Sequence, residues 1–179
     1  MLPVVEGDDV VTVPPPDVSS RTAGGREMGW LESTVKIEVR KPIDEVFGFA
    51  ADATNMDRWM TGVSEPELTT DGEYGVGTTL RSKYTYGGRT HEITHEVTEY
   101  DPPRRHAIKS TSGPYPFVGI LDLEAAGEGG TRVTNAIRAG SDHVVTSVMF
   151  VTMAPFLRMM MRRQLRKELS ALKEVLEAE

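Results

Sequence analysis

The chain has 179 residues and a formal net charge of −7, which suits one domain with room for a core and a cavity. This acidic balance argues against general affinity for nucleic acid or for an anionic membrane surface. Cysteine is absent, which excludes disulfide bonds, thiolate metal sites and a cysteine nucleophile. No basic and apolar leader segment is visible, so we expect a cytoplasmic protein.

Residues 1–31 are predicted to form a flexible tail, followed by one domain over residues 32–179. The tail contains the run Pro14-Pro15-Pro16 and the pair Gly24-Gly25, and it has no periodic apolar face. Little burial is therefore available to offset the conformational entropy that the tail would lose on ordering.

The domain opens with a strand and two short helices. In STVKIEVR, residues 33–40, apolar side chains alternate with charged ones, which is the pattern of a strand with one buried face. Pro42 suits the first turn of a helix, because its missing N–H costs nothing there. Residues 52–55 provide a turn and a new N-cap, and a single further helical turn ends at Trp59.

A succession of four or five strands follows, separated by short turns. Gly87-Gly88 is a tight hairpin signal between the first two of them. Short strands joined in this way indicate an antiparallel meander. The strand segments are residues 78–86, 89–100, 105–111, 115–124 and 131–139.

From residue 141 the apolar period becomes helical. Pro155 is expected to divide this region into a short apolar helix and a long terminal one. Residues 144–157 are mostly apolar, but a membrane-spanning helix needs about twenty residues, which favours a buried helix over membrane contact. The long helix carries one apolar stripe, formed by Leu157, Met161, Leu165, Leu169, Leu172 and Leu176.

This order of elements predicts an α+β fold, in which a curved antiparallel sheet is covered by the C-terminal helix. The motifs VKIEVRKPIDEVFGFAADATNMDRW, GVGTTL, VTEYDPPRR, GGTRVT and LRKELSALKEVLE occur in this order. Residues 32–178, which contain them, resemble the polyketide cyclase/dehydrase branch of the START-like superfamily, also called SRPBCC. The resemblance implies a helix-grip fold, with the two short helices closing one end of the sheet and a deep, mostly apolar pocket inside.

Two histidines are candidates for the pocket. Alternation within RTHEITHEVTEY, residues 89–100, places His91 and His95 on one face of a strand. If that face is concave, both point inward about 13 Å apart, too far to share one metal ion, and we expect neither a metal nor a cofactor. With Tyr84 they are candidate catalytic residues, because an imidazole can position a carbonyl or transfer a proton near neutral pH. The alternative is a position near the edge of the sheet, hydrogen-bonded or solvated.

The same alternation gives a set of candidate ligand-binding residues, largely apolar with a few hydrogen-bonding groups, as in most small-molecule sites. The alternative for Trp59 is core packing. The alternative for the methionines is core filling, although thioether side chains also adapt to ligands of varied shape. The set is Trp59, Tyr86, Tyr115, Phe117, Leu121, Asn135, Met149, Met153, Phe156 and Met160.

Three functions remain open, because this fold serves many activities. The first is binding of an apolar or aromatic small molecule, as a carrier or sensor. The second, which the resemblance implies, is an aromatase/cyclase-type enzyme whose pocket folds a poly-β-ketone chain for aldol closure and dehydration. The third is protein interaction through the basic face of the C-terminal helix, from Arg158 to Lys167. The expected partner is a small molecule, without nucleic acid and without stable membrane insertion.

Overall fold

The structure is a computed structural model that describes residues 31–140 and 144–178, with the backbone alone for residues 144–152. Of the predicted tail, residues 1–31, only Leu31 lies within the described residues, and it begins the first strand. The elements are β1 (Leu31–Val39), α1 (Ile43–Ala50), the 3-10 turn η1 (Ala53–Asn55), α2 (Met56–Trp59), β2 (Val63–Leu68), β3 (Thr79–Tyr86), β4 (Arg89–Asp101), β5 (Arg105–Ser112), β6 (Phe117–Ala126), β7 (Gly130–Ala139) and α3 (Val144–Ala178).

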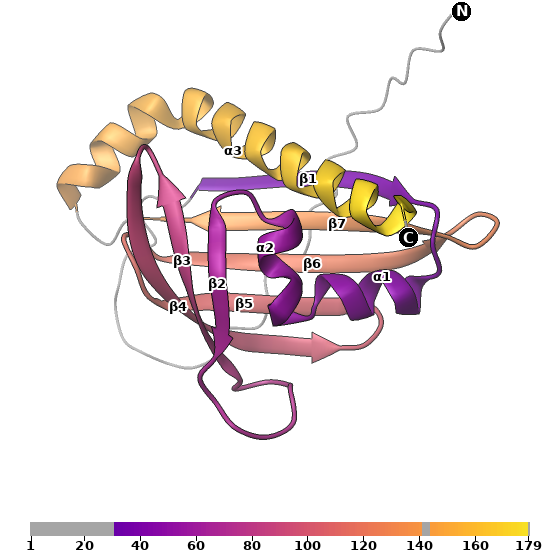
Figure 1. Cartoon of the computed structure of the whole chain (residues 1–179). Helices are drawn as coiled ribbons and strands as arrows, with labels where there is room; N and C mark the ends of the chain where they lie inside the picture. Colours follow the sequence, from indigo (N-terminus) through magenta and orange to yellow (C-terminus); the bar gives the residue numbers. More distant parts are fainter. Residues whose placement is uncertain (1–30, 141–143, 179) are drawn as a thin grey trace, which may run out of the picture.

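The strands form a seven-stranded antiparallel sheet in the order β1-β7-β6-β5-β4-β3-β2. Figure 1 shows the sheet curving so that β2 and β3 stand in front of the other strands, with α1 and α2 on the same side as α3. The predicted α+β helix-grip fold is therefore confirmed.

The edge strand β2 was not expected from the sequence. Its segment VSEPEL has no apolar alternation, and Pro66 cannot donate a ladder hydrogen bond. The pairing with β3 shifts register between Ser64 and Glu67, where Glu65 adopts a positive φ of 51°. A proline and a bulge are tolerated here because β2 has a neighbour on one side only.

The predicted break at Pro155 is wrong, because α3 continues through it as one helix from Val144 to Ala178. A proline removes one helical hydrogen bond and crowds the preceding turn, so it kinks a helix or ends it. Helix on both sides is long enough to continue past this single defect, and Figure 1 shows the axis of α3 curving along its length.

The main core lies where the short helices and the C-terminal half of α3 meet the sheet. Phe47 and Trp59 come from the short helices, and Leu169 and Leu172 come from α3. A fully buried leucine contributes about 1.5–3 kcal/mol relative to an exposed one. Asp52 accepts a hydrogen bond from the backbone N–H of Thr54 at 2.8 Å, which caps η1 and turns the chain toward Trp59.

A buried threonine joins β7 to the start of α1. The Oγ1 of Thr131 donates to the carbonyl oxygen of Lys41 at 2.7 Å, and Thr131 is fully buried. Thr131→Val keeps the shape but leaves that carbonyl without its donor, so we expect the free energy of unfolding to fall by about 1–2 kcal/mol in urea denaturation. The exposed Thr90→Val, as control, should change it by less than about 0.5 kcal/mol. Equal effects of the two substitutions would contradict this role for Thr131.

Candidate functional site

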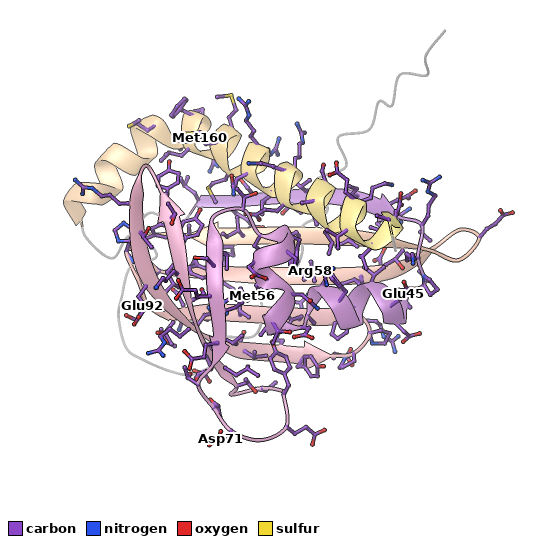
Figure 2. All side chains as sticks on the ribbon, in the orientation of Figure 1. Glu45, Met56, Arg58, Asp71, Glu92 and Met160 are labelled. Carbon is purple, nitrogen blue, oxygen red and sulfur yellow. The ribbon has the colours of Figure 1, made fainter. Side chains whose placement is uncertain are left out.

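A cavity of about 410 Å³ lies between the concave face of the sheet, α2 and α3. Its walls are mainly aliphatic, aromatic and thioether side chains, with a few hydrogen-bonding groups among them. Figure 2 shows Met56 on α2 and Met160 on α3, two residues that line it, and Glu92 on the outer side of β4. The polar side chains in the lining are Ser82, Tyr84, Tyr86, His95, Tyr115, Asn135, Gln164 and Glu168.

His95 is the most deeply buried polar group in the wall. Ile93, His95 and Val97 are all buried, so this face of β4 is the concave one. His95 is 2% exposed, and neither ring nitrogen has a hydrogen-bond partner among the described residues. Burial lowers its pKa to about 4, because desolvation disfavours the charged imidazole. The ring is therefore neutral at pH 7.

His91 does not join His95 in the cavity. It lies two residues into β4, opposite Tyr84 and close to the Gly87-Gly88 turn, and it is half-buried. The cavity lining contains Tyr84 and His95 but not His91. Strand alternation correctly puts both histidines on one face, but it does not say how far along the strand the cavity extends.

Apart from Met149, the predicted ligand-binding residues separate into three groups. Trp59 and Leu121 belong to the core and line a second, smaller chamber. Met153 and Phe156 are 42% and 51% exposed and are absent from the lining. The side chain of Met149 lies outside the described residues. Those that line the large cavity are Tyr86, Tyr115, Phe117, Asn135 and Met160.

The exposed positions of Met153 and Phe156 follow from their place along α3. Leu157, Met161 and Leu165 line the cavity, and they belong to the helix's predicted apolar stripe. Met153 is four residues before Leu157 on the same row, but it and Phe156 precede the first residue of α3 that lines the cavity. Helical periodicity defines the row, but only packing against the sheet decides where along it the cavity begins.

Glu168 and Gln164 line the cavity, and neither was predicted from the sequence. They are four residues apart on α3, so they share a face with Met161 and Leu165. Gln164 Nε2 donates to Glu168 Oε1 at 2.9 Å and lies 3.2 Å from the carbonyl oxygen of Thr61. Burial raises the pKa of Glu168 to about 7, because the cavity wall desolvates the carboxylate.

The raised pKa of Glu168 makes a pH-dependent contribution to stability. Its ordinary value is 4.5, so between pH 4.5 and 7 the folded state binds more protons than the unfolded state, and stability falls as the pH rises. We expect Glu168→Gln to raise the free energy of unfolding by about 1–3 kcal/mol at pH 8 and to leave it nearly unchanged at pH 4. Urea denaturation at both pH values tests this. The exposed Glu174→Gln is the control, and an equal gain at pH 4 and 8 would contradict it.

Two tyrosine hydroxyls accompany Glu168. Tyr84 and Tyr115 both line the cavity, and burial raises the pKa of each phenol, with the nearby Glu168 raising it further. Both phenols therefore stay protonated at neutral pH and can donate hydrogen bonds. The carboxyl group and the two phenols form one polar cluster on an otherwise apolar wall.

The basic face of α3 is exposed to solvent at Arg158, Arg162, Arg166 and Lys167. No ion pair joins these side chains to another described residue. Within residues 31–140 and 144–178, no three His, Asp or Glu side chains are grouped to hold a metal ion. In the same part of the chain, no helix combines the length and apolarity that crossing a membrane requires.

A family model described as polyketide cyclase/dehydrase and lipid transport matches residues 31–177. No curated protein sequence matches the chain. Among solved structures, the protein TTHA0849 from Thermus thermophilus has a TM-score of 0.67 at 19% identity, covering 82% of this chain and 97% of its own.

Two further solved structures have the same fold. The ZhuI aromatase/cyclase from Streptomyces sp. R1128 has a TM-score of 0.67 at 16% identity, covering 83% of this chain and 94% of its own. A START superfamily protein from Mycobacterium smegmatis has a TM-score of 0.68 at 12% identity, covering 82% and 97% respectively. At these identities the likeness establishes the fold alone.

Proposed function

Because the chain belongs to the polyketide cyclase/dehydrase and lipid transport family, we propose that it binds one apolar or aromatic small molecule in the cavity under α3. The observation that carries this proposal is the cavity itself. Its volume of about 410 Å³ lies within the range of small-molecule sites. A folded domain packs its interior closely, so a space of this size lined by apolar side chains suits a guest molecule.

The charge of the wall narrows the ligand class. Among the described residues that line the cavity there is no lysine or arginine, and the one ionisable acid is Glu168. A ligand with a buried carboxylate or phosphate would meet no cation there and would face a carboxyl group. A ligand whose buried part is neutral fits this wall best.

Titration with N-phenyl-1-naphthylamine, a neutral apolar fluorescent probe, tests the proposal. We expect saturable binding of one probe per chain with a rise in fluorescence, because the probe leaves water for an apolar cavity. Mass spectrometry of an organic extract of the purified protein would identify a ligand that co-purifies. Fluorescence that rises without saturation, or that does not rise, would overturn the proposal.

A second candidate is aldol cyclisation and dehydration, and Glu168 favours it. In such a step a base removes a proton from a carbon between two carbonyls, and that carbon attacks a ketone carbon to form a C–C bond. The alkoxide that forms takes up a proton to become a hydroxyl, which then leaves as water when a second C–H proton is lost. A group with a pKa of about 7 suits this proton transfer at neutral pH, whereas His95, with a pKa of about 4, is a weak base.

The two candidates differ in what Glu168→Gln does. A cyclase should lose about 10²–10⁴-fold in turnover of a β-polyketone while it keeps probe affinity within about threefold. A binding protein shows no turnover above the uncatalysed rate with either side chain. Glu174→Gln, on the exposed side of α3, is the matched control. Turnover that is unchanged by Glu168→Gln would remove Glu168 from the mechanism.

A further inference from the structure

A second chamber of about 40 Å³ lies between the short helices and β4, β5 and β6. The two spaces share part of their walls, including Met56, His95, Gly119 and Asn135. At Gly119 a Cβ would lie 3.3 Å from Cγ1 of Ile108, so a larger residue there would crowd this shared wall. The chamber therefore adjoins the large cavity, and a ligand in that cavity lies next to it.

The chamber wall contains polar atoms without partners. Trp59 and His95 are each 2% exposed, and Trp59 Nε1 and both ring nitrogens of His95 have no hydrogen-bond partner among the described residues. An unsatisfied buried polar group costs about 1–3 kcal/mol. These three atoms belong to two residues that line the chamber, and its volume of about 40 Å³ is enough for one small group.

We propose that this chamber is a subsite for a neutral oxygen, a hydroxyl or a ketone carbonyl, at the leading end of an otherwise apolar ligand. The inference rests on the proposed function of the large cavity. Trp59 Nε1–H can only donate, and neutral His95 has one donor and one acceptor nitrogen, whichever tautomer it adopts. A carbonyl oxygen accepts from these donors, and a hydroxyl can both accept from Trp59 and donate to His95.

Charged groups do not fit the same chamber. His106 also lines it, and its Nε2 is 2.9 Å from the hydroxyl of Tyr74, so that imidazole already has a partner. Burial lowers the pKa of His106 to about 4, so both imidazoles are neutral at pH 7. No lysine, arginine, aspartate or glutamate is among the described residues of the lining. A carboxylate or ammonium group would lose its hydration without gaining a counter-charge.

Two matched pairs of probes test the subsite. The hydroxyl pair is 2-naphthol and 2-methylnaphthalene, and the carbonyl pair is 2-acetylnaphthalene and 2-isopropylnaphthalene. For each protein variant the measured quantity is the ratio of the two association constants within a pair. Both members of a pair share the naphthalene ring, so a change in this ratio between variants reports the group in which the two probes differ.

We expect His95→Leu and Trp59→Phe each to lower this ratio at least about fivefold for one pair or both, while the hydrocarbon still binds. The pair that responds shows whether a hydroxyl or a carbonyl is preferred. Val133→Ala, a core substitution that lines neither space, is the control for general destabilisation and should keep the ratio of the unsubstituted protein.

Three outcomes are distinguishable. If the ratio of the two association constants within each pair is the same in every variant, the subsite is overturned and the proposed function stays intact. A resident water could then satisfy these atoms. A change of this ratio in Val133→Ala as large as in His95→Leu or Trp59→Phe would also overturn the subsite. The absence of binding by all four probes would overturn the proposed function, and the subsite with it.

Discussion

Lowering the pH from 7 to 4.5 is expected to reduce the free energy of unfolding of the Glu168→Gln variant by about 3–5 kcal/mol. The cause is the buried His95 and the half-buried His106, whose pKa values fall to about 4 in the folded protein from an ordinary value of 6.5. Between these values the unfolded chain binds more protons than the folded chain. The stability that the two neutral histidines contribute is therefore fully present above pH 6.5 and is lost as the pH falls through 4.

Glu168 acts in the opposite direction over the same range. Its protonated form is favoured in the folded state, so acidification from pH 7 to 4.5 restores stability that its ionisation removes. The native sequence should then lose only about 2–3 kcal/mol over this range, less than the Glu168→Gln variant. The two histidines and Glu168 thus partly compensate one another.

Urea denaturation at a series of pH values measures both effects. Adding His95→Leu to the Glu168→Gln variant should remove about half of its loss on acidification, because one of the two titrating imidazoles is gone. His91→Leu is the matched control, since His91 lies outside both cavities. If the acid sensitivity is the same with and without His95, the burial of a neutral imidazole is not its cause.

Local patterns in the sequence were sufficient for most of the fold. The period of two along β4 predicted that His95 shares a face with Ile93 and Val97, and those residues are buried. The turn glycines and the helical leucine stripe located the hairpin and α3 in the same way. The edge strand β2 was not predicted, because its proline and acidic residues interrupt the apolar alternation that indicates a strand.

The cavity could not be predicted in the same detail, because empty space depends on how distant elements fit together. No pattern in the sequence singles out Glu168, and only the packing of α3 against the sheet brings it to the cavity wall. Met153 and Phe156 have helical spacing, but they are exposed and lie outside the cavity lining. Trp59 was considered for ligand stacking and for core packing, and its place beside Leu169 and Leu172 is in the core.

Filling the cavity is expected to abolish ligand binding without unfolding the protein. Ser82 lies on β3 opposite Ile93, is 4% exposed, and lines the large cavity. In Ser82→Trp the indole would project from the concave face into the space that a guest would occupy. We expect the affinity for N-phenyl-1-naphthylamine to fall at least about 100-fold, which corresponds to about 2.7 kcal/mol of lost binding free energy.

The stability of this variant distinguishes a filled cavity from a damaged core. Inserting a large side chain into a close-packed interior usually costs about 1–3 kcal/mol, whereas a ring that enters an empty apolar space loses little or gains burial. Lys83→Trp is the matched control, because the next side chain on β3 is exposed on the outer face and its ion pair with Glu65 is worth less than about 1 kcal/mol. Probe affinity that survives Ser82→Trp would place the bound molecule outside this cavity, and the proposed function would then lose the observation on which it rests.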